Sequence, residues 1–268
     1  MSRYLLRFTA LGYVAFLLLV PVGFVFYRAF GDGLGHAWDA VTTDRAIHAL
    51  ELTLMLTAIA VPANTIVGII LALMLVRTRF RGRGLLNAVV DLPLALSPVV
   101  VGLALYLLYG RGGWLGGLAE RGVHVLFAFP GMLLATMFVS LPFVVREVVP
   151  VLREIGTEQE QAAETLGARP FQVFRRVTFP AIRWAVAYGV VLTTARCIGE
   201  FGAVSIVSGR IEGKTETLPI YVQSQYAFDF DTSGAYAASV VLALIAIATV
   251  VLLRVFQPKE EVLWWASP

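Results

Sequence analysis

The segment Thr157–Pro180, TEQEQAAETLGARPFQVFRRVTFP, is the longest charged stretch in a chain that is otherwise mostly apolar, and it decides the fold. Thr157 followed by Glu160 is a capping-box pattern, so we expect a helix to begin there. Gly167 should end that helix, because glycine tolerates the left-handed conformation that a helix C-terminus often needs. Pro170 can open a second short helix, which Pro180 is expected to end. The segment therefore predicts a helix–turn–helix with an apolar side and a charged rim, called the elbow below.

The composition is that of an integral membrane protein. The mean hydropathy is +0.79, with 58% hydrophobic and 15% charged residues, whereas a soluble domain carries about 25% charged residues. The net charge of +3 does not indicate a nucleic-acid partner, because basic residues in a chain with several spans first report topology. The single cysteine, Cys197, excludes an intrachain disulfide and is expected to pack within its apolar run.

The hydropathy pattern predicts an all-α membrane protein with six transmembrane helices, since each apolar run is long enough to cross a bilayer. The expected spans are Tyr4–Tyr27, Leu52–Val76, Leu85–Tyr109, Phe129–Val149, Trp184–Val207 and Ala235–Phe256. Pro93 and Pro98 should break the third span. The polar stretches Gly31–Glu51, Gly110–Val123 and Ser208–Gly234 are expected to be external loops. A signal peptide is the alternative for the first run, but no small-x-small cleavage site follows it, so we interpret it as a retained anchor.

The arginines and lysines test this topology independently. Two thirds of the 21 Lys and Arg residues fall on the side of the elbow, which the positive-inside rule places in the cytoplasm together with both termini. The expected organisation is an N-terminal helix with an external loop, residues 1–48, a transport domain, residues 49–256, and a cytoplasmic tail, residues 257–268.

The elbow also resembles a known motif. It contains two adjacent alanines, a glycine after three further residues and an aliphatic residue after nine more. After one more residue come a large apolar residue and proline. This spacing resembles the EAA loop of ABC importer membrane subunits. The residues that carry the resemblance are Ala162, Ala163, Gly167, Val177, Phe179 and Pro180. It implies a cytoplasmic loop that docks on the ATPase subunit through Glu160, Gln161, Ala162, Ala163, Gly167 and Pro180. The family usually has Glu where this chain has Gln161, with Glu160 one residue earlier. An amphipathic loop lying on lipid headgroups is the alternative, although it would not need Gly and Pro at these offsets.

One charged pair lies inside the predicted fifth span. Arg196 and Glu200 are four residues apart, so they can meet on one helix face. An unpaired Arg at the centre of a span is unfavourable by at least about 2.5–3.5 kcal/mol, so Arg196 must face protein or water. The pair either fixes helix packing or lines the transport pathway or its gate, and Gly199 and Gly202 are further candidates for that pathway. Ala195, Gly199 and Ala203 form a small-residue ladder that would let another helix approach closely.

A second resemblance covers nearly the whole chain, about Tyr4–Phe256. The run ARCIGEFGAVSIVSGRIEGKTETLP, Ala195–Pro219, closely resembles the W-type permease subunits of sulfate/thiosulfate ABC importers. DLPLALSPVVVG, Asp91–Gly102, and FVSLPFVVRE, Phe138–Glu147, are similar to the same family. Molybdate permeases share the GEFGA and GKT.TLP pieces, so a molybdate importer is the alternative.

This resemblance implies a type I ABC importer transmembrane domain in a prokaryotic inner membrane. The implied partners are an ATPase dimer, a T-type permease subunit, a periplasmic or lipid-anchored sulfate-binding protein and the lipid bilayer. No catalytic residue, metal or cofactor is expected. The GKT at Gly213–Thr215 is not a phosphate-binding loop, because the position that requires the first glycine is Ser208.

Two other functional classes are disfavoured by the residues. An intramembrane hydrolase would need a Ser–His pair or metal ligands in the membrane, but the three histidines are all placed outside it and no HExxH or GxSxG occurs. A secondary transporter or channel could contain broken helices and a buried Arg196–Glu200 pair. A secondary transporter or channel would not explain the elbow.

Overall fold

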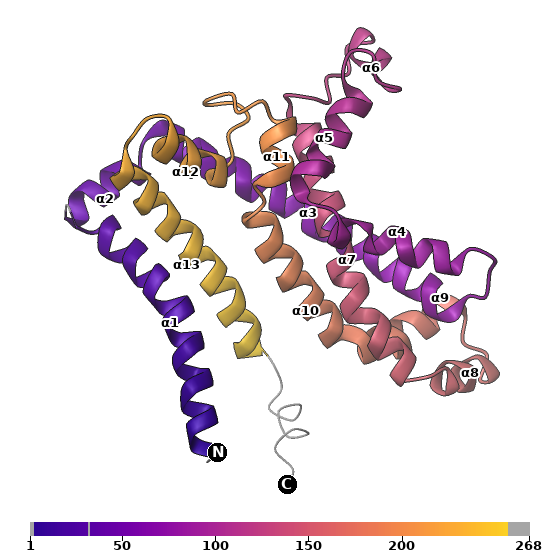
Figure 1. Ribbon diagram of the computed structural model, residues 1–268. Helices are drawn as coiled ribbons and strands as arrows, with labels where there is room; N and C mark the ends of the chain where they lie inside the picture. Colours follow the sequence, from indigo (N-terminus) through magenta and orange to yellow (C-terminus); the bar gives the residue numbers. More distant parts are fainter. Residues whose placement is uncertain (1–2, 32, 257–268) are drawn as a thin grey trace. The chain divides into compact units, whose positions relative to one another are not determined.

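The computed structural model describes residues 3–31 and 33–256, and in these residues the chain forms helices without strands (Figure 1). The expected tail, residues 257–268, lies outside the described residues. In chain order the helices are α1 (Arg3–Ala29), α2 (Leu34–Val41), α3 (Asp44–Arg77), α4 (Arg83–Ala95), α5 (Pro98–Tyr109), α6 (Gly117–Glu120), α7 (Phe129–Glu154), α8 (Glu158–Thr165), α9 (Pro170–Val173), the π-helical turn η1 (Phe174–Thr178), α10 (Phe179–Ile198), α11 (Gly202–Val207), α12 (Leu218–Ala227) and α13 (Thr232–Phe256).

Within the described residues, five helical segments are long and apolar enough to cross a membrane, and α4 with α5 could add a sixth. These two helices are bent by 110°. The break follows from Pro98, because the residue before a proline is pushed into extended conformation, and Ser97 has φ −63° and ψ 136°. Pro93, by contrast, lies inside α4 without ending it. The expected break is confirmed at Pro98, whereas the prediction that Pro93 also breaks the span is wrong.

Three other expected boundaries are wrong. The fifth span does not continue to Val207: α10 ends at Ile198 and a separate short helix, α11, begins at Gly202. The predicted external loops Gly31–Glu51 and Ser208–Gly234 also contain helices, namely α2, the start of α3, and α12. These helices escaped prediction because α2, with 8 residues, and α12, with 10, are too short to produce a span-like hydropathy signal.

The chain divides into two compact units. Among the described residues, unit 1 comprises residues 3–31, 33–52 and 212–245, and unit 2 comprises residues 53–211 and 246–256. In unit 1, a small core joins Ala46 and Ala49 of α3 to Tyr221 of α12 and Ala238 of α13.

The core of unit 2 is built around α7, whose Val144, Val148 and Leu152 are fully buried. Glycines bring the neighbouring helices close to it. A Cβ on Gly68 of α3 would lie 2.8 Å from the Cβ of Val144, and one on Gly189 of α10 would lie 2.8 Å from its Cα. Small residues of this kind let membrane helices pack at short distance. Helix α7 is therefore packed closely against both α3 and α10.

A polar contact supplements this packing. The buried side-chain amide of Asn64 on α3 donates to the Met137 carbonyl at 2.9 Å and to the Ser140 hydroxyl at 2.8 Å, both on α7. Such contacts between spans contribute on average about 0.6 kcal/mol. They fix the register of α3 on α7 more than they raise stability.

Candidate functional site

The elbow has the helix–turn–helix form that its sequence predicts. Helix α8 begins at Glu158 and ends at Thr165, and the turn that follows contains Gly167 with φ +85°, a left-handed conformation that glycine adopts without strain. Pro170 occupies the first position of α9, where its missing N–H leaves no intrahelical hydrogen bond unmade. Gly167 thus forms the turn after the first helix and Pro170 begins the second, as the sequence predicts.

The predicted capping box at Thr157 is wrong. The Thr157 side chain forms no cap hydrogen bond and instead accepts one from the Gln161 side-chain amide at 3.1 Å. The carboxylate of Glu160 points to other partners, described below, so it cannot reach back to the Thr157 N–H. Side-chain capping occurs one helix later, where the Arg169 N–H donates to the Gln172 side-chain oxygen at 2.8 Å.

The prediction that Pro180 ends the second helix is also wrong. Residues from Pro170 to Ile198 form one 29-residue helical segment that is apolar enough to span a membrane. A proline ring normally clashes with the carbonyl four residues back. Here the proline follows η1, where the Phe179 N–H bonds to the carbonyl of Phe174, five residues back. The wider turn accommodates Pro180, and the elbow passes directly into α10.

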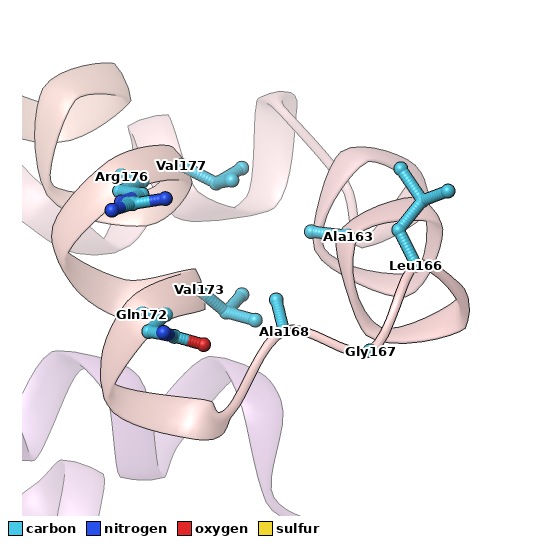
Figure 2. Close-up of a pocket in the computed structure, with 8 residues that line it drawn as sticks. All are labelled: Ala163, Leu166, Gly167, Ala168, Gln172, Val173, Arg176 and Val177. Atoms are coloured by element: carbon cyan, nitrogen blue, oxygen red, sulfur yellow. The ribbon is translucent and has the colours of Figure 1, made fainter.

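A shallow pocket lies between the two arms of the elbow. Figure 2 shows Ala163 on α8 pointing toward Val173 and Val177 on the other arm. The remaining lining residues are Leu166, Gly167, Ala168, Gln172 and Arg176. Leu166 is 89% exposed, and none of the residues of α8 is buried. The apolar side of the elbow is therefore only partly covered by this chain.

Arg77, the last residue of α3, makes the main polar contact to the elbow. Its Nε lies 2.9 Å from Oε2 of Glu160, and one of its terminal nitrogens donates to Oε1 of the same carboxylate at 3.2 Å. The guanidinium also donates to the carbonyls of Leu152 at 3.1 Å and Gly156 at 2.6 Å. On the far side, the hydroxyl of Thr178 donates to Glu160 at 2.7 Å. These five residues, called the Arg77 network, all belong to unit 2.

The predicted pathway residues lie at the break between the end of α10 and the start of α11. Arg196 and Glu200 form the expected ion pair at 2.8 Å, but Glu200 lies outside a helix, in the break between the two. Glu200 is 3% exposed, and its second oxygen accepts a hydrogen bond from the Ala203 N–H at 2.9 Å. The pairing is confirmed, and its carboxylate also stabilises the first turn of α11.

The small-residue ladder of Ala195, Gly199 and Ala203 does not lie on one helix, because the chain leaves helical conformation between them. Close packing occurs instead between α5 and α11. A Cβ on Gly102 would lie 2.6 Å from the Ala203 carbonyl oxygen, and one on Gly202 would lie 2.8 Å from the Cβ of Pro98. Gly202 is thus a contact glycine, whereas Gly199 is exposed.

The family model for the inner membrane component of binding-protein-dependent transport systems matches residues 64–262. The chain belongs to this family. The matched region includes the elbow, the Arg77 network and the Arg196–Glu200 pair, so the permease carries all three within its family domain.

Relatives match the permease over most of their length. It is 49% identical to the sulfate transport system permease protein CysW of Synechocystis over 96% of this chain and 93% of that one. It is 48% identical to the CysW of Escherichia coli over 92% and 85% of the two chains. Identity to the sulfate transport system permease protein CysT of Salmonella typhimurium is 41%, over 88% and 85%.

A solved structure has the same fold. The permease matches a chain in the crystal structure of a bacterial ABC transporter involved in import of the acidic polysaccharide alginate with a TM-score of 0.77, over 95% of this chain and 96% of that one. Sequence identity is 18%, so the likeness concerns the fold alone. The permease is therefore an all-helical, multi-pass inner membrane protein with the transmembrane fold of ABC importers.

Sequence reasoning missed two charged contacts between helices of the permease. Arg77 is one of the basic residues on the side of the elbow, and nothing in its local sequence indicates its partner Glu160, which lies 83 positions away. Arg146 on α7 is another of these basic residues, and it donates to Asp91 on α4 at 2.6 Å. No local pattern links residues at these separations, so only the packing of the helices identifies the pairs.

Proposed function

We propose that this permease is the W-type membrane subunit of an ABC importer for sulfate or thiosulfate. The proposal is supported by the relatives named CysW, at 48–49% identity, against 41% for CysT. We assign residues 49–256 to the transport domain, residues 1–48 to an N-terminal helix and external loop, and residues 257–268 to a tail. The arginine distribution favours cytoplasmic termini and a cytoplasmic elbow.

The exposed elbow is the observation that carries the coupling role. Leu166, which lines the pocket between the two arms, is 89% exposed, and Phe171, which precedes the lining residue Gln172 in the chain, is 71% exposed. Exposed apolar residues gathered at a pocket mark a protein interaction surface. We assign this surface to a separate ATPase subunit. The coupling residues are those of the motif: Glu160, Gln161, Ala162, Ala163, Gly167 and Pro180.

Transport follows from coupling two states of the complex. Two ATPase subunits bind ATP more tightly in one arrangement than in the other, and the elbow carries that difference to the spanning helices. A T-type permease completes the membrane core, and a periplasmic or lipid-anchored binding protein delivers the anion. ATP hydrolysis resides in the ATPase subunits, and this chain supplies part of the pathway.

The Arg196–Glu200 pair is the proposed pathway or gate element of this chain. The side chain of Arg196 is 31% exposed, while its partner carboxylate is buried. The Arg196 guanidinium can therefore contact a transported dianion while it stays close to Glu200. Gly199, exposed in the break after α10, and Gly202, packed on Pro98, belong to the same element. The break itself provides backbone groups that a continuous helix would not.

The test is ATP hydrolysis by the reconstituted complex with its binding protein loaded in turn with sulfate, thiosulfate and molybdate. Stimulation by sulfate or thiosulfate is the expected result. Stimulation by molybdate alone would place the permease in a molybdate importer. Sulfate accumulation in liposomes that contain only this chain, without ATP, would show a secondary transporter and overturn the importer proposal.

A further inference from the structure

The side chains of helix α8 anchor it only weakly to the rest of the chain. None of its eight residues is buried, so burial of apolar side chains does not fix it. Glycine turns flank it on both sides, Gly156 with φ +62° and Gly167 with φ +85°. A short helix between two such turns can reorient as a unit unless another contact restrains it.

The Arg77 network supplies that restraint. The Leu152 carbonyl is one of the last in α7 and lacks an intrahelical donor, so the Arg77 guanidinium satisfies it and favourably meets the negative end of the helix dipole. The same group binds the Gly156 carbonyl in the turn before α8. It also pairs with Glu160 in the first turn of α8. One planar cation therefore joins α3, the end of α7 and α8.

Glu160 extends the network to the next spanning segment. It accepts a hydrogen bond from Thr178, which is 3% exposed and lies directly before α10. Glu160 and Arg77 are each only 16% exposed, so water competes weakly for the ion pair. Three long helices, α3, α7 and α10, are thus linked to α8 through one carboxylate and one guanidinium.

We propose that Arg77 is a positioning residue that clamps α8 to α3, α7 and α10, so that displacement of α8 moves these three helices together. This inference rests on the proposed coupling role of the elbow. Arg77 is suited to the task because its guanidinium donates in several fixed directions at once, which the single ammonium of lysine does not reproduce. Glu160 stands one residue before the Gln161 that replaces the family's Glu, and its carboxylate is bonded to Arg77 and Thr178 of this chain.

The first experiment measures the clamp in the permease alone. A nitroxide label is attached at Glu164→Cys, an exposed position on α8, in a chain with Cys197→Ser. Arg77→Lys and Glu160→Gln should each make the label more mobile by electron paramagnetic resonance. Arg79→Lys is the matched control, because Arg79 is exposed in the next loop, and it should leave the spectrum unchanged. Equal mobility in all four chains would overturn the clamp.

The second experiment measures coupling in proteoliposomes that hold the complete complex. Arg77→Lys should leave ATPase co-purification and ATP hydrolysis near their normal values but lower sulfate transported per ATP by about fivefold or more, the usual range of coupling between sites. Thr178→Val should lower it less. If transport and hydrolysis fell together with the amount of assembled complex, Arg77 would be structural and the proposal wrong.

A separate variant distinguishes failure of the clamp from failure of the coupling role. Ala163→Glu places a charge in the elbow pocket at a residue that is not itself part of the Arg77 network, and it should abolish ATPase co-purification. Val123→Glu, at a half-exposed position outside the elbow, is the control. Retained co-purification with Ala163→Glu would refute docking at the elbow, while the mobility result would still decide whether Arg77 clamps α8.

Discussion

Helix α3 carries an arginine near each end, and the two are held in different ways. Arg45, in its first turn, faces three carboxylates: Glu216 bidentately at 2.7 and 2.8 Å, Asp229 at 2.9 Å and Glu212 at 3.3 Å. Arg77, the last residue, binds one carboxylate and two backbone carbonyls. Arg45 therefore joins side chains within unit 1, whereas Arg77 joins the ends of helices within unit 2.

The difference separates a stabilising site from a positioning site. The charge of Arg45 is outweighed by its three carboxylates, so this cluster repels a dianion and does not belong to an anion pathway. Its role is to hold the loop before α12 and the residues after α12 against the start of α3. Arg77 contacts main-chain atoms at the end of α7 and in the turn before α8, so its hydrogen bonds hold these segments in a fixed position relative to α3. We therefore expect substitution of Arg45 to affect mainly stability and substitution of Arg77 mainly coupling.

The largest expected effect tests the first half of this comparison. Arg45→Leu leaves the carboxylate of Glu216, which is 1% exposed, buried without its cation. Breaking a buried ion pair in this way destabilises a protein by about 3–5 kcal/mol. The measurement is the unfolding free energy in detergent micelles. Arg45→Leu/Glu216→Leu should recover much of the loss. Glu212→Gln, at a carboxylate that is 66% exposed, should change stability by less than about 1 kcal/mol.

A smaller effect is expected at the other end of α3. Arg77→Leu leaves the two carbonyls and Glu160 without their donor, which should reduce the unfolding free energy by about 1–3 kcal/mol. The loss is smaller because Glu160 keeps the hydrogen bond from Thr178 and retains some access to water. The same unfolding measurement compares the two variants. A greater loss for Arg77→Leu than for Arg45→Leu would contradict the division into a stabilising and a positioning site.

The two arginines also show what sequence can predict. The turn at Gly167 and the helix start at Pro170 depend on the backbone preferences of single residues, and both were predicted. The break after Ile198 was not, because apolar residues continue on both sides and hydropathy does not detect a loss of helical conformation. The partners of Arg45 lie 171 and 184 positions away in the chain, and that of Arg77 lies 83 away. Such pairs depend on how helices pack, so the sequence shows the charges but not their contacts.

The smallest expected effect concerns a hydrogen-bonded carboxylate in unit 1. Asp231 immediately precedes α13, and its side chain accepts hydrogen bonds from the Gly234 N–H at 3.0 Å and the Ser233 hydroxyl at 2.8 Å. This is the geometry of a helix N-cap, and Asp231→Ala should reduce stability by about 0.5–2 kcal/mol. Asp231→Asn, which keeps a capping oxygen, is the matched control and should lose less.

The pH dependence of this effect distinguishes the cap from simple packing. The hydrogen bond from the Gly234 N–H, followed by that from Ser233 and the nearby His36, lowers the pKa of the Asp231 carboxyl below its ordinary range. A carboxyl whose pKa is lower in the folded state stabilises that state above its unfolded pKa, about 3.9, and loses the contribution as pH falls through the folded value. The difference between the native chain and Asp231→Ala should thus be present above about pH 4 and shrink as the pH falls further. A difference independent of pH throughout would mean that the carboxylate charge does not hold the start of α13, in contrast to the charge-held contacts of Arg45 in the same unit.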